Sequence, residues 1–177
     1  IGITDRDGVY GSVRAHIAAQ ELGVRLCIGS ELSLEDGTTL VLLAQHRAGY
    51  ANLCQLITRG RLRHEKGRCT VSYTDVCEHA AGLIALWGGD KSALASRHGY
   101  RPQLARQLRE AFDDRLYALL TRHKRASEPV QEALLRERVA IGGEMLTRTV
   151  SIGVALGSPG RDTTSDLLRR ADQAVLN

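Results

Sequence analysis

Basic side chains are concentrated in one short segment, and they are the residues with the most evident chemical use. The segment RGRLRHEKGR has five basic residues and one acidic residue, and its basic members are Arg59, Arg61, Arg63, Lys66 and Arg68. Lysine and arginine neutralise phosphate, so this segment could contact DNA. The alternative is a solvated connection between a helix and the next strand. We favour the alternative, because no aromatic side chains are interleaved with the basic ones to stack on bases.

The cysteines form a second group with possible metal chemistry. Cys27, Cys54, Cys69 and Cys77 lie 27, 15 and 8 positions apart, and no two form a CxxC pair. Structural zinc sites use such close pairs, so the spacing argues against one. It predicts four reduced thiols, and the apolar neighbours of Cys27 and Cys54 predict that these two lie in the core.

Length and composition indicate one soluble globular domain, or one domain with an appended piece. The chain has 177 residues, of which 43% are hydrophobic, and this is enough for a core. No run of about 18 apolar residues occurs, and the N-terminus lacks the features of a signal peptide, so we expect a cytoplasmic protein without a membrane segment. The net charge of +4 fits a nucleic-acid partner without proving one. Because the chain starts at Ile1 inside a predicted strand, we expect a segment upstream of it.

Strand-like and helix-like segments alternate along residues 1–140. The predicted strands are short runs rich in apolar and β-branched residues, and the predicted helices carry apolar residues at helical spacing. The strands are IGIT, VRLCIGSEL, TTLVLLAQ, GLIALW and RLYALLTRH; the helices are VRAHIAAQELG, AGYANLCQLITRGRL, YTDVCEHA, residues 102–112 and EPVQEALLRERVA. Gly23 is predicted to end the first helix. Such alternation is typical of a parallel α/β sheet or barrel.

The pattern changes at residue 141, which divides the chain into residues 1–140 and residues 141–177. In the second part, IGGEML predicts a turn, TRTVSIGVALG a strand and TTSDLLRRADQAVLN a helix. The helix is amphipathic, and its apolar face carries Leu167, Leu168, Ala171 and Val175. Two elements cannot bury enough apolar surface by themselves, so we expect this tail to pack against the preceding body.

Several segments resemble, in the right order, the PHP domain of bacterial error-prone DNA polymerases, which are related to the alpha subunit of the replicative polymerase. They are ITDRDGVYGSVRAH, GVRLCIGSELSLEDG, LVLLAQHRAGYANLCQLITRGRL, HAAGLIALWGGDKSALA and DDRLYALLTRHKRASEPVQEALLRERVA. The resemblance implies a truncated barrel of parallel strands with metal ligands at the C-terminal ends of the strands. Gly88, Gly89 and Asp90 match the WGGD position of that family, and we interpret them as a turn.

The resemblance implies a metal site of which only part is present. Thr4, Asp5 and Arg6 stand where the family has Thr-Asp-His, and an arginine has no lone pair to give to a metal. Glu31 matches an acidic ligand, and His123 matches a later ligand position. The first and last motifs of the family would fall outside residues 1–140. We therefore expect a degenerate site that binds zinc or manganese weakly, and in which Arg6 could instead pair with Glu31.

These residues also have plainer interpretations. Glu31 could be a solvated carboxylate at a strand end, and His123 could be a surface histidine before a basic loop. His46, in AQHRAGY, is interpreted as an exposed loop residue rather than a ligand. Asp5 is expected to orient a neighbouring group or to cap the turn together with Asp7.

The last 37 residues resemble the end of a GGDEF domain, the diguanylate cyclase fold, in the sequences TVSIGVA and LLRRADQAV. The catalytic hairpin, the metal-binding acid and the nucleotide-binding residues of that family would lie upstream of this segment. The resemblance therefore implies no active site in residues 141–177.

The resemblance of residues 1–140 implies part of a bacterial error-prone DNA polymerase that acts in replication or repair, with DNA and the rest of the polymerase as partners. The polymerase carboxylates are not among these residues, so we expect no catalytic residue and no cofactor other than weakly bound metal. Two alternatives stay open. One is a remnant of a cyclic-di-GMP signalling protein, and the other is a metal-dependent phosphoesterase, against which the missing ligands argue.

Overall fold

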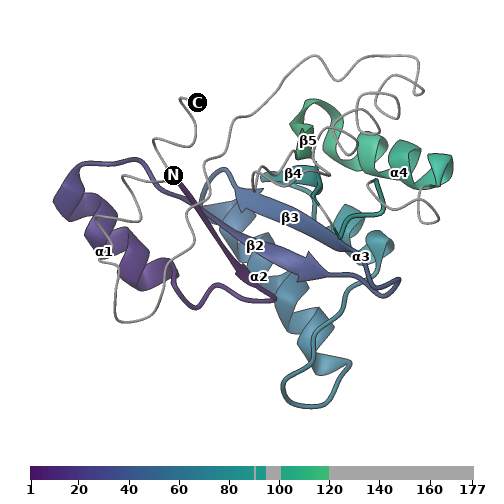
Figure 1. The fold of residues 1–177 in the computed structure, drawn as a ribbon, viewed down its shortest axis with the longest axis horizontal. Coiled ribbons are helices and arrows are strands. Elements are labelled where there is room, and N and C mark those ends of the chain that lie inside the picture. The colour runs from purple at the N-terminus through teal and green to yellow at the C-terminus, as the bar shows by residue number, and fades with distance from the viewer. Residues whose placement is uncertain (90, 95–100, 120–177) are drawn as a thin grey trace, which may run out of the picture.

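The described part of the structure is a five-stranded sheet with helices packed against it (Figure 1). The structure is a computed structural model, and it describes residues 1–89, 91–94 and 101–119. The strands, which lie side by side in sequence order, are β1 (Gly2–Arg6), β2 (Cys27–Ser33), β3 (Thr39–Ala44), β4 (Leu83–Gly88) and β5 (Leu116–Leu119). The helices are α1 (Ser12–Leu22), α2 (Arg47–Leu62), α3 (Tyr73–Glu78) and α4 (Pro102–Phe112), with a 3-10 turn, η1, at Asp113–Arg115.

Strand direction differs from the parallel arrangement that the alternating pattern predicts. The pairs β1–β2 and β4–β5 are parallel, whereas β2–β3 and β3–β4 are antiparallel. A parallel crossover needs about a dozen residues or more, and only residues 34–38 separate β2 from β3. The chain must therefore turn back on itself there, so the sheet is mixed rather than parallel.

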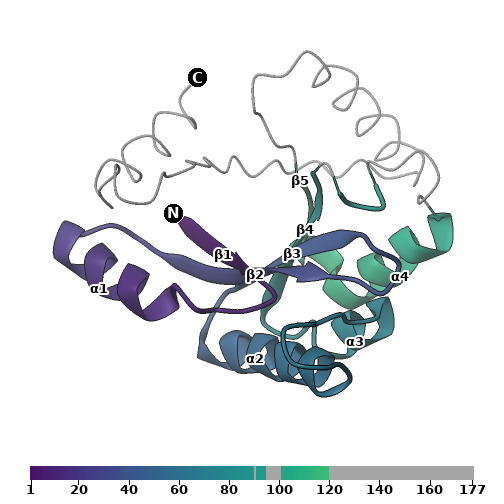
Figure 2. The ribbon, with the colours of Figure 1, turned by 60° about the horizontal axis from the view of Figure 1, so that its bottom comes forward.

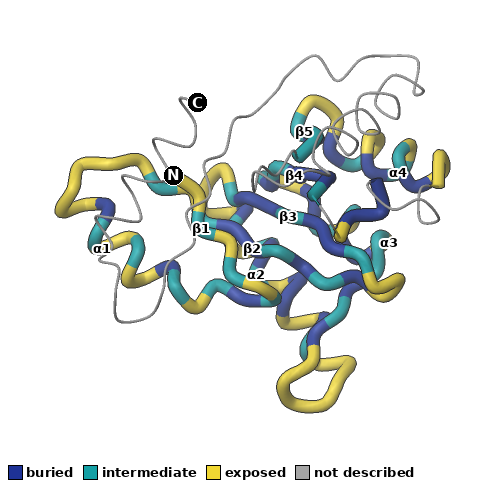
Figure 3. The backbone as a smooth tube through the Cα atoms, viewed as in Figure 1, coloured by how far each residue is buried: buried dark blue, intermediate teal, exposed yellow. Residues whose placement is uncertain are grey.

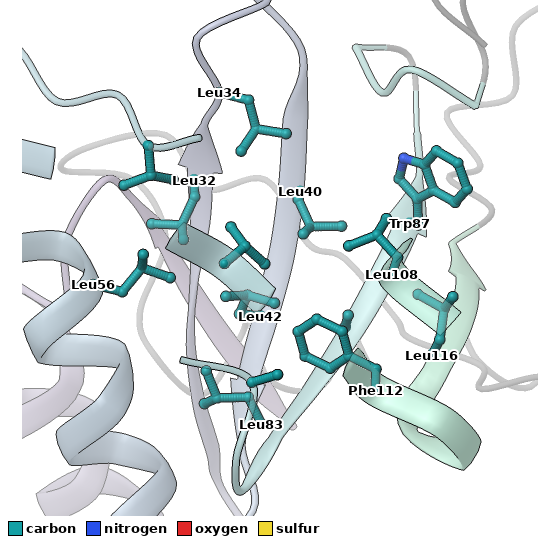
Figure 4. Close-up of a cluster of buried hydrophobic side chains, with 14 of the residues drawn as sticks. Leu32, Leu34, Leu40, Leu42, Leu56, Leu83, Trp87, Leu108, Phe112 and Leu116 are labelled. Atoms are coloured by element: carbon teal, nitrogen blue, oxygen red, sulfur yellow. The ribbon is translucent and has the colours of Figure 1, made fainter. Parts of the chain in front are cut away.

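Three helices cover one face of the sheet, and the core lies between them and the strands. Figure 2 shows α2, α3 and α4 on this face, while α1 lies beside the edge strand β1. Leu32 on β2 and Leu40 on β3 are direct cross-strand neighbours, and Leu42, two residues further on β3, points to the same side. Helices α2 and α4 fill the space against them with the buried side chains Leu56, Leu108 and Phe112 (Figure 4), and Leu53 belongs to the same core cluster.

Local sequence accounts for the helix ends. Gly23 has a φ of 64° and ends α1 in the left-handed conformation, which confirms the predicted cap. Helix α3 begins with a capping box, in which Ser72 accepts from the Asp75 N–H and Asp75 accepts from the Ser72 N–H. Pro102 opens α4, where its missing N–H costs no hydrogen bond.

The cysteines are placed differently from the prediction. Cys27 is exposed and Cys54 is half-buried, so the prediction that Cys27 lies in the core is wrong. Cys27 begins β2 opposite Gly2, which has no side chain to cover it. Burial raises the pKa of the Cys69 thiol, and it raises the pKa of Cys77 to about 11, so both remain thiols at neutral pH.

Some predicted segments lie wholly or partly outside the described residues. The predicted strand RLYALLTRH is described only as far as Leu119, and EPVQEALLRERVA, the tail of residues 141–177 and His123 lie beyond it. Within the described ranges, no helix is long and apolar enough to cross a membrane.

Leu42 and Leu62 allow a matched test of this core. Leu42 is fully buried, whereas Leu62 is 82% exposed. Leu42→Ala should lower the free energy of unfolding by roughly 2–5 kcal/mol, because it leaves a cavity under the sheet. Leu62→Ala should change it by less than about 0.5 kcal/mol. Urea denaturation followed by circular dichroism measures both values, and equal effects would show that the core is wrongly placed.

Candidate functional site at the ends of strands β1 and β2

The parallel pairing of β1 and β2 brings Arg6 and Glu31 together. These two residues are partners in the register of the pair, each near the C-terminal end of its strand. Nη2 of Arg6 donates to Oε1 of Glu31 at 2.8 Å, and their side chains are 50% and 34% exposed. The possible pairing of Arg6 with Glu31 is thus confirmed. The positive charge beside Glu31 belongs to the protein itself, in the place where the family resemblance implies a metal ion.

Asp7 connects the end of β1 to β2 and α2. Its carboxylate accepts the Ser33 N–H at 2.7 Å and the Ser33 hydroxyl at 2.8 Å. Its own N–H donates to the Glu31 carbonyl at 2.9 Å, and its carbonyl accepts from Arg61 of α2 at 2.5 Å. Asp7 has a φ of 50°, a conformation that costs energy for a residue other than glycine. These four hydrogen bonds hold it there.

Asp5 and Ser30 fasten the loop between β1 and α1. Asp5 accepts the N–H of Gly11 at 2.5 Å, which confirms the expectation that it caps this turn. Ser30 is fully buried, and its hydroxyl donates to the Asp5 carbonyl at 2.9 Å and accepts the N–H of Gly8 at 3.1 Å. Two carboxylates that could have faced a cation, Asp5 and Asp7, are therefore used to shape the backbone.

The other candidate ligands are not close to Glu31. Cys27 lies four residues before Glu31 on β2, or about 13 Å along the strand. His46 follows β3, and the C-terminal end of β3 pairs with the N-terminal end of β2. His46 therefore lies near the opposite end of β2 from Glu31. There its Nδ1 accepts from the N–H of Gly49 at 3.3 Å and caps α2, and the residue is exposed, as interpreted from the sequence.

The donor set does not fit a metal cluster. Among the described residues, no group of three or more histidine, cysteine, aspartate or glutamate side chains could hold a metal ion. Glu31 already has a guanidinium partner, and the oxygens of Asp7 accept from Ser33. His123 lies outside the described residues, so its proximity to Glu31 stays a prediction.

The basic segment divides into paired and unpaired residues. Arg63 makes two hydrogen bonds to Asp75, at 2.5 and 2.9 Å, and Nε of Arg59 lies 3.1 Å from the same carboxylate. Arg59 also pairs with Glu78 at 2.5 Å. Arg59 and Arg63 therefore join α2 to α3, and these two side chains are less suited to contacting DNA than the sequence suggests.

Asp75 is the buried centre of this ion-pair group. Burial by itself would raise the pKa of its carboxyl, but hydrogen bonds from Arg63 and Ser72 outweigh that effect and hold the pKa well below its usual range. The hydrogen bond to Asp75 in turn raises the pKa of Arg63. The Ser-x-x-Asp spacing at residues 72–75 is a capping signal that could have identified Asp75 from sequence. No such signal marks Asp7 or Ser33.

Asp75→Asn should destabilise the fold by roughly 2 kcal/mol at pH 7, because it leaves Arg63 without its partner. The lowered pKa of Asp75 means that its carboxylate stabilises the fold above the unfolded pKa of about 4, and that this stabilisation is lost as the pH falls through the folded pKa. The difference between wild type and Asp75→Asn should thus be constant near neutral pH and shrink below about pH 4. Urea denaturation across pH measures it.

Glu78→Gln provides the control for the Asp75 prediction. The Glu78 side chain is 52% exposed, and its pair with Arg59 should contribute less than about 1 kcal/mol. An equally large effect at Glu78, or a difference for Asp75→Asn that grows in acid, would contradict the assignment.

Comparison with known proteins places this geometry in a family. The PHP domain family matches residues 1–136. The error-prone DNA polymerase of Rhodopirellula baltica is 34% identical over 142 residues, which are 77% of this chain and 12% of that protein. Its counterpart in Pseudomonas aeruginosa is 37% identical over 169 residues, or 95% of this chain and 15% of that protein. The counterpart in Pseudomonas fluorescens is 41% identical over 124 residues, or 70% of this chain and 11% of that protein.

The coverage of these matches bears on both parts of the chain. The chain spans between about a tenth and a sixth of the length of the curated relatives it matches. The family match ends at residue 136, and the alignment over 95% of the chain continues the similarity to polymerases into residues 141–177. The comparisons contain nothing that supports the GGDEF resemblance of this tail, which stays a prediction.

Residues 1–136 carry the PHP signature, and the chain belongs to the PHP domain family, in which it is homologous to bacterial error-prone DNA polymerases.

Proposed function

We propose that this chain is the PHP domain of a bacterial error-prone DNA polymerase, and that it supports the polymerase without hydrolytic chemistry of its own. Its relatives are several times longer and are named for the polymerase activity of the whole protein. A role in DNA synthesis during replication or repair, and a location in the cytoplasm, follow from that membership as part of the proposal.

The observation that carries the proposal is the ion pair between Arg6 and Glu31. A hydrolytic site of this family type needs a cation at the strand ends that activates water and binds phosphate. Here the guanidinium stands 2.8 Å from the carboxylate, and an arginine remains protonated at any physiological pH. A divalent cation at the same place would meet like-charge repulsion as well as a carboxylate that is already paired.

The proposed role is mechanical. The network of Asp5, Asp7, Ser30 and Ser33 locks the β1–α1 loop to β2, and Arg61 ties that loop to α2. A rigid surface at the strand ends suits a domain that packs against the rest of a large protein. The alternative of a metal-dependent phosphoesterase has less support, because the described residues include no group of three or more side chains that could hold a metal ion.

Metal content tests this proposal directly. The purified 177-residue chain should contain substoichiometric zinc or manganese by mass spectrometry, and it should show no phosphoesterase or 3′ to 5′ exonuclease activity above that of Glu31→Ala. Arg6→His should raise metal affinity, because it removes the fixed charge and supplies an imidazole beside Glu31. Arg6→Lys is the matched control, since it keeps the charge and should bind no more metal than wild type.

Two results would overturn the proposal. One is tight binding of two or more metal ions per wild-type chain. The other is hydrolysis by the wild-type chain that Glu31→Ala abolishes. Either would mean that ligands other than those described here complete the site.

A further inference from the structure

Tyr10 stands beside the basic segment, although it lies 51 positions before Arg61 in the sequence. Arg61 donates a hydrogen bond to the Tyr10 hydroxyl, and its guanidinium carbon lies 5.6 Å from the centre of the ring. Gly8 makes room for this arrangement, since a Cβ there would lie 2.3 Å from Cε2 of the ring. The tyrosine is nevertheless 71% exposed. The fold thus supplies the aromatic side chain that the basic segment lacks in sequence.

Three basic residues of the segment have no carboxylate partner among the described residues. Arg59 and Arg63 pair with Asp75, whereas Arg61 bonds only to the Asp7 carbonyl and the Tyr10 hydroxyl among the described residues. Both of these bonds come from Nη2, so Nη1 and Nε remain available. Lys66 and Arg68 are exposed, and they form no salt bridge within the part of the chain that the structure describes.

The loop that carries Lys66 and Arg68 returns to the side of α2 close to Arg61. A Cβ at Gly60 would lie 2.9 Å from the sulfur of Cys69, so the residue after Arg68 packs on the residue before Arg61. Burial is the main cause that raises the pKa of the Cys69 thiol; the nearby charge of Asp7 also raises this pKa, and that of Arg61 lowers it. Figure 3 shows the loop as a protruding, exposed segment at the end of α2. Tyr10, Arg61, Lys66 and Arg68 form what we call the Tyr10 surface.

We propose that the Tyr10 surface binds single-stranded DNA, with a base stacked on Tyr10 and phosphates contacted by Arg61, Lys66 and Arg68. An exposed aromatic ring beside unpaired basic side chains is the combination by which proteins bind single strands without reading sequence. A duplex keeps its bases stacked inside, so the ring has nothing to stack on there. The choice of DNA as the strand rests on the proposed function, whereas the stacking surface rests on the geometry alone.

Fluorescence anisotropy with the full chain and a labelled oligothymidylate of about 16 nucleotides tests this proposal. The single strand should bind more tightly than a duplex of equal length. Tyr10→Ala should weaken binding about tenfold, and Tyr10→Phe should not, because the ring is kept. The double variant Lys66→Ala/Arg68→Ala should reduce the slope of log affinity against log salt concentration by about 1.4.

Matched controls separate this surface from general charge effects. Arg106→Ala removes an exposed arginine of α4 and should leave affinity within about twofold. Alanine at position 10 could weaken binding by loosening the loop rather than by removing the ring. Tyr10→Leu controls for this, because it keeps a large apolar side chain without an aromatic face, and it should weaken binding as much as Tyr10→Ala does. Circular dichroism verifies that each variant is folded.

Three outcomes would overturn the inference: no binding at about 50 mM salt, equal binding of duplex and single strand, or equal losses in Tyr10→Ala and Arg106→Ala. None of them touches the proposed function, which is decided by metal content and hydrolysis. Conversely, tight metal binding by the wild-type chain with normal oligonucleotide binding would overturn the proposed function and leave this inference in place.

Discussion

The parallel pairing of β1 with β2 is the constraint on which the rest of the site depends. It places Arg6 opposite Glu31 and brings Asp7 over Ser33, so the chemistry at the strand ends follows from one register. A shift of one residue would turn these side chains to the other face of the sheet. The hydrogen bonds of Asp7 to β2 and α2 hold this register and also fix the path of the loop that leads to α1.

One consequence concerns charge. Carboxylates at converging strand ends repel each other unless cations lie between them. Here Arg6 provides the positive charge for Glu31, whereas the Asp7 carboxylate accepts hydrogen bonds from Ser33. Between α2 and α3, Arg59 and Arg63 likewise provide positive charge beside the carboxylate of Asp75. Glu31 and Asp75 are therefore neutralised by arginines of the protein itself.

Predictions that rest on a few neighbouring residues were correct, whereas predictions that depend on how distant strands pair were wrong. Gly23 and the bounds of α4 were predicted correctly, because a cap glycine, an opening proline and helical spacing act over a few residues. The prediction of a parallel sheet was wrong, although the five residues between β2 and β3 already required a hairpin. The core placement of Cys27 was also wrong, because exposure depends on the neighbouring strand. His123 and the tail stay predictions.

The sequence by itself determined most of the elements, the family resemblance and the presence of Arg6 where that resemblance implies a histidine. These are properties of residue type and of short-range order along the chain. Only the tertiary structure decided which basic side chains form ion pairs and which do not, because pairing depends on distances between residues far apart in sequence. It assigned Arg59 and Arg63 to Asp75, and it set Tyr10 against Arg61 across 51 positions. Such contacts arise when strands and helices pack to bury their apolar faces, and no local pattern records them.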